Sequence, residues 1–336
     1  MTPALATFDL TKDYAVGFWR KRPYRALDRL NLTVGAGEVF GFLGPNGAGK
    51  TTTLKLLMQL VYPTSGRAEI LGLPAGDLRV KRRLGYLPEN PYFYDHLTAE
   101  ELLIYFAGLF GYSSTDARAR AGRLLDDVGI GAERRLQLRK FSKGMIQRVG
   151  IAQALVNDPE LVIFDEPMSG LDPLGRRDVR ALILRLRDRG CTVFFSSHVL
   201  SDAEALCNRV AILAHGRLVA SGALNDMVSL ESRGWELVMA NVPAPLAGSL
   251  AKTARVNRIV QISEERFAFE LPVEPPPERL VGELTAAGAR LVSLNPIRDT
   301  LEEIFVRRVA DAPARERSGA MASPRATEPG CGAEPR

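Results

Sequence analysis

The first two thirds of the chain alternate between two patterns of apolar residues. Short apolar or alternating runs predict strands at residues 4–10, 27–34, 38–43, 68–72, 83–87, 161–164 and 191–195. Between several of them, apolar residues recur three and four positions apart, which predicts helices at residues 50–60, 115–128, 143–157 and 174–188. Thr98 with Glu101 three residues later fits a capping box and predicts another helix. Alternating strands and helices predict an α/β fold with a parallel sheet between helices.

The pattern changes at about residue 224. Residues 235–240, 258–262, 266–271 and 290–294 predict short strands, residues 275–288 a helix with proline at its start, and residues 301–309 a last short helix. Residues 311–336 contain one large apolar side chain, Met321, which predicts disorder. We therefore expect a large α/β domain at residues 1–224, a small α+β accessory domain at residues 225–310 and a disordered tail at residues 311–336. A regulatory, a dimer-stabilising and a plain packing role of the accessory domain all stay open.

Composition and charge narrow the class of protein. The chain has 336 residues, of which 46% are hydrophobic and 25% charged, as in ordinary globular proteins. No apolar run reaches the length of a membrane-spanning helix, and the N-terminus lacks the pattern of a secretion signal. The three cysteines have neither paired nor metal-like spacing, which suits a reducing cytosol. The net charge of +5 permits contact with an anionic membrane surface but predicts no nucleic-acid partner.

A glycine-rich loop stands between the strand predicted at residues 38–43 and the helix predicted at residues 50–60. It fits the pattern G-x-x-x-x-G-K-[ST], in which backbone N–H groups surround phosphates and the lysine reaches the β- and γ-phosphate oxygens. The helix N-terminus adds the positive end of its dipole at the same point. The loop therefore predicts binding of a nucleoside triphosphate. Its residues are Gly44, Pro45, Asn46, Gly47, Ala48, Gly49, Lys50 and Thr51, followed by Thr52.

Polar residues follow two more of the predicted strands. Asp165 and Glu166 come directly after residues 161–164, and His198 lies just after residues 191–195. Since ligands bind at the carboxyl ends of parallel strands, we expect these side chains to meet the glycine-rich loop. Thr51 and Asp165 are suitable ligands for Mg²⁺, and Glu166 is a suitable general base for a water beside the γ-phosphate.

Two alternatives to these roles stay open from the residues alone. His198 would hydrogen-bond the γ-phosphate or the attacking water, but it also fits a satisfied surface histidine. Asp165 and Glu166 also fit simple strand-end caps.

Between the first two predicted strands, Tyr14 and Tyr24 accompany a basic cluster at residues 20–25. An aromatic ring there would stack on a nucleotide base or belong to a surface hairpin, and the basic cluster predicts a solvated loop.

Five motifs in order resemble those of the ATP-binding subunit of an ABC transporter. They are the glycine-rich loop, residues 141–145 (FSKGM), residues 161–167, residues 169–172 and His198. The resemblance covers about residues 4–224 and is nearest to ATPases that pair with permeases of the ABC-2 export class. It implies a P-loop NTPase fold in which an antiparallel β subdomain and a helical subdomain flank a parallel-sheet core. It also implies ATP and Mg²⁺ as cofactors and a homodimer that closes head to tail around two ATP molecules.

The resemblance also implies roles for single residues. Lys50 and Thr51 contact the phosphates and magnesium, and Thr52 lies near the α-phosphate. Asp165 is the magnesium-associated carboxylate, and Glu166 resembles the catalytic base.

Further roles concern the contacts between the two copies. His198 resembles the switch histidine, and Asp172 resembles the residue that links the two sites across the dimer. Ser142 and Gly144 resemble the motif that caps the γ-phosphate in the opposite subunit. With the family in view, Tyr14 becomes the favoured ring for stacking on adenine, and Tyr24 is its rival.

Two positions depart from the family pattern. The capping motif commonly reads LSGGQ, so Lys143 stands where a glycine is usual and either points away from the nucleotide or adds a contact to phosphate. A loop that usually carries a glutamine carries Glu89, whose carboxylate can approach magnesium but adds charge. Neither change predicts an inactive subunit.

The resemblance implies a peripheral subunit on the cytoplasmic face of the membrane that hydrolyses ATP and drives an integral ABC-2 permease. A permease helix would contact the chain near Glu89, where Tyr92, Phe93 and Tyr94 line a groove or belong to a local core. A soluble ABC ATPase acting on ribosomes or DNA is the alternative. The single cassette and the lack of a coiled coil before Ser142 disfavour it. A non-enzymatic, nucleotide-gated dimerisation module is the third hypothesis, and Glu166 disfavours it.

Overall fold

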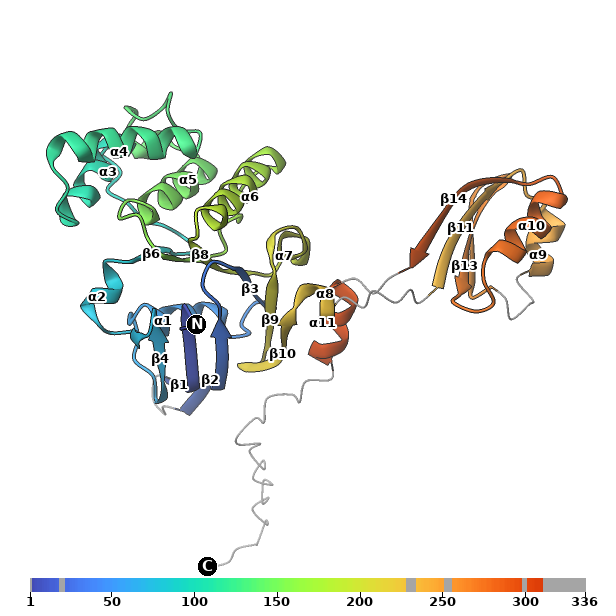
Figure 1. Cartoon of the computed structure of the whole chain (residues 1–336), viewed down its shortest axis with the longest axis horizontal. Coiled ribbons are helices and arrows are strands. Elements are labelled where there is room, and N and C mark those ends of the chain that lie inside the picture. The colour runs from blue at the N-terminus through green and yellow to red at the C-terminus, as the bar shows by residue number, and fades with distance from the viewer. Residues whose placement is uncertain (1, 18–21, 228–233, 251–255, 298–300, 311–336) are drawn as a thin grey trace, which may run out of the picture.

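The computed structural model describes residues 2–17, 22–227, 234–250, 256–297 and 301–310. Within these ranges, none of the helices combines the length and apolarity needed to cross a membrane. Figure 1 shows two bodies, a large one that contains the N-terminus and a smaller one built from β11 to β14 with two helices.

A six-stranded sheet in the order β10-β9-β3-β8-β7-β6 forms the centre of the large body. Neighbouring strands among β9, β3, β8, β7 and β6 are parallel, and β10 pairs with β9 antiparallel. Every residue of β3, β7 and β8 is buried, as expected for strands covered on both faces. The predicted parallel sheet is therefore confirmed. The strands are β3 (Val39–Leu43), β6 (Leu84–Leu87), β7 (Leu161–Asp165), β8 (Thr192–Ser197), β9 (Arg209–Ala214) and β10 (Arg217–Ala223).

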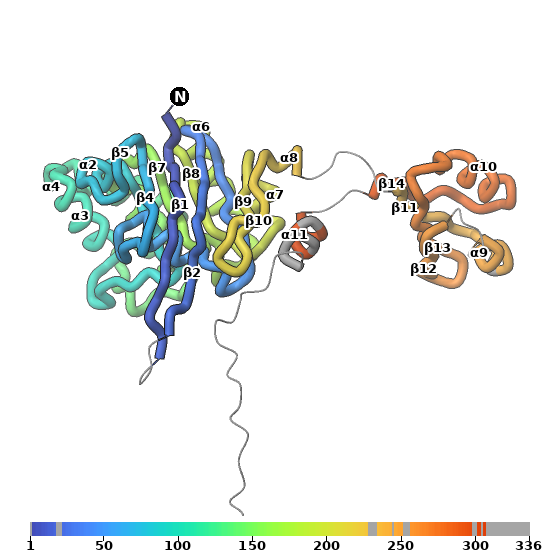
Figure 2. Tube along the Cα trace, turned by 90° about the horizontal axis from the view of Figure 1, so that it is seen from below, coloured from blue at the N-terminus to red at the C-terminus, as the bar shows by residue number. Residues whose placement is uncertain are grey.

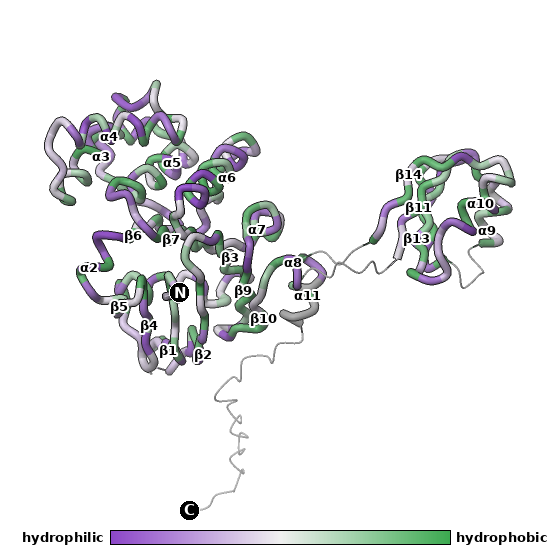
Figure 3. Tube along the Cα trace, viewed as in Figure 1, coloured by the Kyte–Doolittle hydropathy of each residue, from purple (hydrophilic) through white to green (hydrophobic). Residues whose placement is uncertain are grey.

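Alternate residues of these strands belong to two separate hydrophobic clusters, one on each face. Phe164 and Phe195 belong to the cluster shared with α3 to α7. Phe42 and Phe194, whose ring centroids lie 5.4 Å apart, belong to the cluster shared with α1 and an antiparallel sheet. Figure 3 shows mixed apolar and polar colouring along α4 and α6, as expected for helices with one exposed face. The helices are α1 (Lys50–Leu57), α2 (Leu78–Lys81), α3 (Ala99–Leu109), α4 (Ser114–Asp127), α5 (Lys143–Ala154), α6 (Pro173–Asp188) and α7 (Leu200–Leu206).

The antiparallel sheet has the order β2-β1-β4-β5 and consists of β1 (Leu5–Val16), β2 (Arg22–Val34), β4 (Ser65–Ile70) and β5 (Leu73–Pro74). β1 and β2 extend well beyond the strands predicted at residues 4–10 and 27–34. Residues 22–25 therefore lie in a strand and not in a loop, so that part of the prediction was wrong, but all four are exposed to solvent as predicted. Cross-strand pairs explain the extension, since Arg25 Nε donates to Asp13 Oδ1 at 2.9 Å. Residues 20 and 21 lie outside the described residues.

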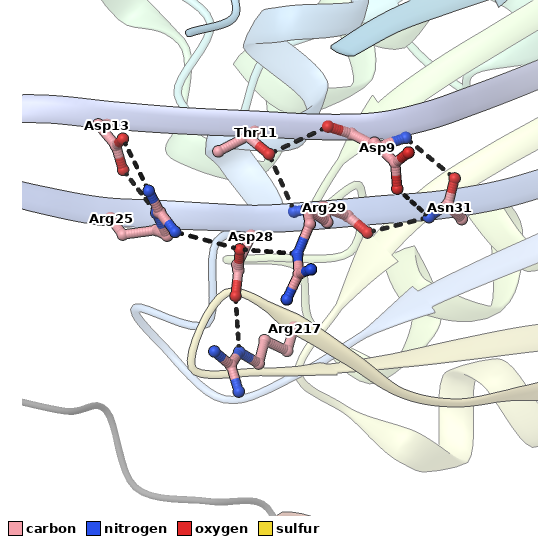
Figure 4. A network of polar contacts seen from close by, with 8 residues as sticks. All are labelled: Asp9, Thr11, Asp13, Arg25, Asp28, Arg29, Asn31 and Arg217. Atoms are coloured by element: carbon pink, nitrogen blue, oxygen red, sulfur yellow. Dashed lines mark hydrogen bonds and ion pairs between the residues drawn. The ribbon is translucent and has the colours of Figure 1, made fainter. Parts of the chain in front are cut away.

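A polar network joins this hairpin to the turn between β9 and β10 (Figure 4). The Asp28 carboxylate is almost fully buried and accepts a hydrogen bond from Arg217 Nε at 2.8 Å. Its other oxygen lies 3.4 Å from Arg25 Nη1 and 3.5 Å from Arg29 Nε. The Asp28 N–H also donates to the Gly216 carbonyl at 2.8 Å. The antiparallel sheet is thereby attached to the central sheet beside the glycine-rich loop.

The smaller body is a four-stranded antiparallel sheet with two helices (Figure 2). Its order is β12-β13-β11-β14, formed by β11 (Gly234–Ala240), β12 (Arg258–Ser263), β13 (Arg266–Pro272) and β14 (Arg290–Ile297). These strands confirm the predicted ones. The helix predicted at residues 275–288 is α10 (Glu278–Ala286), which starts later because three consecutive prolines precede it. The second helix, α9 (Ala244–Leu250), was not predicted.

The last helix, α11 (Leu301–Ala310), packs against the large body. Leu301 is fully buried and belongs to the core cluster of α3 to α7, and Phe305 packs against the same cluster. The Leu301 N–H donates to Glu204 Oε1 of α7 at 3.0 Å. The chain thus leaves the large body after α8 (Leu224–Met227) and returns to it with α11 (Figures 1 and 2). Residues 311–336, for which disorder was predicted, lie outside the described residues.

Candidate functional site

The glycine-rich loop lies between β3 and α1 and is in close contact with two other strands. A Cβ on Gly49, whose φ is +112°, would lie 2.6 Å from the carbonyl oxygen of Ala26 in β2. A Cβ on Gly44 would lie 2.5 Å from the carbonyl oxygen of Leu213 in β9. Only glycine fits at these two positions, so the close packing explains the sequence of the loop. The other loop residues differ in exposure: Asn46 and Gly47 are exposed, and Ala48 is buried.

Lys50 opens α1 and turns its ammonium back over the loop. The side chain is 6% exposed, and Nζ donates to the Gly44 carbonyl at 2.7 Å and lies 3.3 Å from Glu166 Oε1. The positive charge of a buried lysine is thus balanced by a carbonyl and a carboxylate. Thr51 and Thr52 are half-buried in the first turn of α1, and Thr51 Oγ1 lies 3.5 Å from Asp165 Oδ1.

Asp165 ends β7 and is only 1% exposed. Its Oδ1 accepts a hydrogen bond from Ser196 Oγ at 2.6 Å, whereas its Oδ2 is buried and has no hydrogen-bond partner among the described residues. Burial raises the pKa of the Asp165 carboxyl, hydrogen bonds from Ser196 and Thr51 oppose this, and the charges of Glu89 and Glu166 raise it further. A buried, unpartnered carboxylate oxygen beside a hydroxyl suits a small divalent cation. The donor set therefore fits Mg²⁺.

The backbone of Glu166 makes a left-handed turn, with φ at +51°. Its N–H donates to Ser196 Oγ at 3.0 Å. Its carbonyl accepts from the Ser169 N–H at 3.0 Å and from Gln147 Nε2 at 3.3 Å. Gln147 Nε2 lies equally close to the Pro167 carbonyl. Because this conformation is unfavourable for a non-glycine residue, these contacts hold Glu166 in a strained geometry.

The Glu166 carboxylate lies between two cationic or proton-bearing groups. Its Oε2 is 2.9 Å from His198 Nδ1, and its Oε1 is 3.3 Å from Lys50 Nζ. The Glu166 residue is 8% exposed, and the side chain of His198 is about half exposed. A cavity of about 90 Å³ adjoins the pair. The structure thus brings together Lys50, Thr51, Asp165, Glu166 and His198, as the sequence predicted from the ends of three strands.

A second group of predicted residues lies where α5 and α6 begin. Ser142 Oγ accepts from the Met145 N–H at 3.2 Å, and Asp172 Oδ1 accepts from the Gly175 N–H at 2.9 Å, so both side chains are helix caps. A Cβ on Gly144 would lie 3.3 Å from Leu171 Cδ2, which shows that these two helix starts pack together. The Lys143 side chain lies against Gly170 beside this contact, since a Cβ on Gly170 would be 3.0 Å from Lys143 Cδ.

The remaining predicted residues have mixed surroundings. Tyr14 is half-buried with Lys12 Nζ 5.1 Å from its ring centroid, and it pairs across the hairpin with the exposed Tyr24. Glu89 is exposed in the loop after β6.

The aromatic residues after Glu89 differ in burial. Tyr92 and Tyr94 are exposed, at 95% and 65%, so they line the surface. Phe93 packs against the core and is therefore a local core residue.

Two functional contacts were not predicted from the sequence. Ser196 bridges Asp165 and Glu166, and Gln147 holds the Glu166 turn. Ser196 directly follows the strand predicted at residues 191–195, so its place at the strand ends was expected but its role was not. Gln147 is 1% exposed within a helix, and a buried polar position in an otherwise apolar pattern was the available signal.

Comparison with known proteins identifies the family. The ABC transporter family model matches residues 27–169. An uncharacterised ABC transporter ATP-binding protein of Synechocystis sp. is 43% identical over 307 residues, which cover 91% of this chain and 84% of the relative. The daunorubicin/doxorubicin resistance ATP-binding protein DrrA of Streptomyces peucetius is 32% identical over 322 residues, 94% of this chain and 95% of the relative.

A solved structure agrees with this result. It is the dimeric, post-hydrolysis state of the ATP-binding cassette MJ0796 bound to ADP and Pi, which is 26% identical, with a TM-score of 0.61 over 66% of this chain and 99% of the other. The chain is therefore an ATP-binding, ATP-hydrolysing subunit that belongs to the ABC transporter family.

Proposed function

We propose that this chain powers export through a separate ABC-2 permease, with Glu166 as the general base for ATP hydrolysis. The observation that carries the proposal is the position of the Glu166 carboxylate, 3.3 Å from the lysine of the phosphate loop and 2.9 Å from His198. A base in this position is within reach of a water beside the γ-phosphate.

Nucleotide binding would rearrange the partners of Lys50. Its ammonium now contacts the Gly44 carbonyl and Glu166, which are weaker partners than a triphosphate. A phosphate on the loop takes over Lys50, and Glu166 is released from the ion pair while its hydrogen bond with His198 remains. The freed carboxylate orients a water and accepts its proton, and His198 holds the carboxylate in place. Tyr14 is the proposed stacking ring for adenine.

Thr51 and Asp165 would hold Mg²⁺, with Glu89 near enough to influence it. The unpartnered Oδ2 of Asp165 supports this assignment. When bound, the ion neutralises charge on the phosphate oxygens.

A head-to-tail homodimer would complete each site. The N-terminus of the 12-residue helix α5, with Ser142 and Gly144, is suited to cap the γ-phosphate held by the second copy. Asp172, at the start of α6, adjoins this helix start and would connect the two sites. That the solved cassette MJ0796 is dimeric supports this arrangement.

The permease would dock beside the loop that carries Glu89, where Tyr92 and Tyr94 expose their rings. The chain would then lie on the cytoplasmic face of the membrane as a peripheral subunit. Resistance to daunorubicin and doxorubicin in the name of DrrA supports export as the direction of transport. We further propose that residues 234–297 form the accessory domain and that α11 completes the ATPase domain.

Replacing Glu166 by Gln tests the central assignment. We expect hydrolysis to slow by about 10²-fold or more, the usual range for a general base, while ATP binding is retained and the ATP-bound variant accumulates as a dimer. Glu160→Gln, which changes an exposed glutamate at the opposite end of β7, should leave the rate unchanged. Phosphate release by Glu166→Gln at the parental rate would contradict the proposal. Co-purification with a membrane protein in detergent tests the permease partner separately.

A further inference from the structure

The far end of the β1–β2 hairpin carries Tyr14 and extends past the rest of its sheet. The pairing between β1 and β4 ends with Thr11 and Ser65, so beyond that point β2 is the only strand paired with β1 in the described part of the chain. We call residues 12–16 and 22–25 the hairpin end, and none of them is buried. A two-stranded ribbon of exposed residues is marginally stable in water, so other contacts have to fix the position of Tyr14.

A β-bulge in β2 separates the hairpin end from the rest of the sheet. Lys12 pairs with Leu27 and the next residue, Asp13, pairs with Arg25, so Ala26 is an extra residue in β2. A bulge bends its strand and redirects the residues beyond it. The bulge is also where β2 meets the glycine-rich loop, because the Ala26 carbonyl oxygen lies against a loop glycine. The hairpin end thus changes direction beside the loop that would hold the phosphates.

A chain of hydrogen bonds leads from the glycine-rich loop to the residues beside the bulge. The Ala48 carbonyl in the loop accepts from the Gly216 N–H at 2.8 Å, and the Gly216 carbonyl accepts from the Asp28 N–H at 2.8 Å. The side chain of Asp28 is 5% exposed and accepts from Arg217 Nε at 2.8 Å. Asp28 is therefore fixed to the turn between β9 and β10, which is itself bonded to the loop.

Arg25 continues this chain to the hairpin end (Figure 4). Its Nη1 lies 3.4 Å from Asp28 Oδ1, and its Nε and Nη2 donate to the two carboxylate oxygens of Asp13 at 2.9 Å and 3.2 Å. Bidentate, charge-assisted hydrogen bonds are strong and define the geometry of both partners. On the opposite side, the Asp13 N–H donates to Thr64 Oγ1 at 2.9 Å. Asp13, which directly precedes Tyr14, is thereby held from two sides.

We propose that Asp28 is a positioning residue for the adenine ring of ATP. The proposal rests on the role proposed above for Tyr14. Through Arg25 and Asp13, the Asp28 carboxylate sets where the Tyr14 ring stands relative to the glycine-rich loop. The adenine and the phosphates of ATP are joined covalently, so both bind well only when ring and loop are already placed for each other. Asp28 thus raises the affinity for ATP without contacting it.

Asp28→Asn tests this role, because it keeps the size of the side chain but removes its charge and one acceptor oxygen. In calorimetric titrations, ATP binding should weaken about tenfold, within the range for the loss of one stacked base. Binding of inorganic triphosphate, which has no base, should stay that of the parent. Asp9→Asn, an exposed aspartate nearer the start of β1, is the matched control and should bind both ligands as the parent does. Equal losses for the two ligands, or no loss for ATP, would overturn the proposal.

Arg25→Gln breaks the same chain at an exposed residue and leaves the contact between Asp28 and Arg217 in place. It should show the same selective loss of ATP binding, and it carries the test if Asp28→Asn does not fold. A variant of Arg25 that binds ATP as the parent does would contradict the proposed chain.

A double-mutant cycle shows whether Asp28 acts through Tyr14. Tyr14→Ala should also weaken ATP binding about tenfold. Combined with Asp28→Asn, it should bind ATP no more weakly than Tyr14→Ala alone, since a misplaced ring and a missing ring lose the same contact. Losses that multiply in the double variant would refute a role through Tyr14.

Hydrogen exchange of the backbone amides tests the hairpin end without nucleotide. In Asp28→Asn these amides should exchange faster than in the parent, and in Asp9→Asn they should exchange at the parental rate. Unchanged exchange in Asp28→Asn would overturn the proposal. Unchanged ATP affinity in Tyr14→Ala would instead count against the stacking ring in the proposed function, and the exchange comparison still decides whether Asp28 holds the hairpin end.

Discussion

The two main sheets of this molecule bury their strands differently, and they offer different surfaces for function. The six-stranded sheet has helices or a second sheet on both faces, so β3, β7 and β8 are buried at every residue. In the described part of the chain, the sheet of the accessory domain is covered by helices on one face only, and β13 alternates between buried and more exposed residues. In the first, polar chemistry is confined to the strand ends. In the second, a whole face remains available.

Buried charge follows the same division. Lys50, Asp165 and Glu166 are nearly inaccessible at one edge of the central sheet, and each is held by its neighbours except for one oxygen of Asp165. On the accessory sheet, Glu236 and Glu270 keep access to solvent and pair with each other, and Glu270 also pairs with the exposed Arg258. The first arrangement suits a small, highly charged ligand, whereas the charges of the second stay hydrated and balanced within the sheet.

The largest expected effects are losses of stability on substitution in the hydrophobic core of each body, and each loss should be confined to one body. Leu301→Ala should destabilise the large body by about 2–4 kcal/mol, because Leu301 is fully buried in its core although it follows the accessory domain in sequence. Phe269→Ala, at the centre of the accessory core, should destabilise only that domain, by about 3–5 kcal/mol. Calorimetry that resolves two transitions would check both. A shift of the accessory transition by Leu301→Ala would contradict the attachment of α11 to the large body.

Much of this division could be predicted from the sequence, and its exceptions have physical reasons. Continuous apolar runs identify β7 and β8, and the polar residues directly after them identify the site. The apolar residues Leu301 and Phe305 predict an amphipathic helix, but no local pattern tells which of two cores it completes. That choice depends on contacts with α7, almost 100 positions away in the chain.

The geometry within the site was also beyond prediction from the sequence. Two adjacent acidic residues at the end of a strand do not predict a left-handed backbone turn at the second one. This turn at Glu166 directs the side chains of Asp165 and Glu166 to different partners. The ion pair between Lys50 and Glu166 likewise depends on the order β3-β8-β7 in the sheet, and no single strand predicts that order.

The next largest effect is expected from removing the ammonium group of Lys50 in the buried site. Lys50→Ala should weaken ATP binding by about 10²-fold or more, because each hydrogen bond to a charged group contributes about 1.5–3 kcal/mol. Titration with a fluorescent ATP analogue would measure the loss. Lys55→Ala, an exposed lysine on the same helix, is the control and should bind as the parent does. Unchanged affinity in Lys50→Ala would mean that another group neutralises the phosphates.

A smaller effect is expected from the contact that holds the Glu166 turn. Gln147→Met keeps the volume but removes the donor to the Glu166 carbonyl, so kcat should fall about tenfold while KM changes little, which corresponds to one net hydrogen bond. Gln153→Met on the same helix is the matched control.

Gln147→Glu distinguishes positioning from simple packing. A carboxyl there can donate to the carbonyl only when protonated, so activity should be partly restored at low pH and lost as the pH rises. A pH profile parallel to that of the parent would exclude a positioning role for this side chain.

The smallest effect concerns stability without nucleotide. The pKa of Asp165 in the folded protein is raised above its ordinary value of 3.8, chiefly by burial. The unfolded chain therefore releases this proton at a lower pH than the folded chain, and the free energy of unfolding falls as the pH rises from about 4 through the raised pKa. Asp165→Asn avoids this loss, so at neutral pH the nucleotide-free variant should unfold a few degrees higher than the parent.

The advantage of Asp165→Asn should vanish below pH 4, where both chains carry a neutral group, and it should reverse when Mg-ATP is present. Unfolding temperatures of the parent and the variant, measured across this pH range with and without Mg-ATP, would check both expectations. A variant less stable than the parent at neutral pH without nucleotide would show that the Ser196 and Thr51 hydrogen bonds outweigh burial. If Mg-ATP instead reverses the order of stability as expected, the buried Asp165 carboxylate lowers the stability of the nucleotide-free protein and raises that of the Mg-ATP-bound protein. The charges of the accessory sheet carry no such cost, because they stay in contact with solvent.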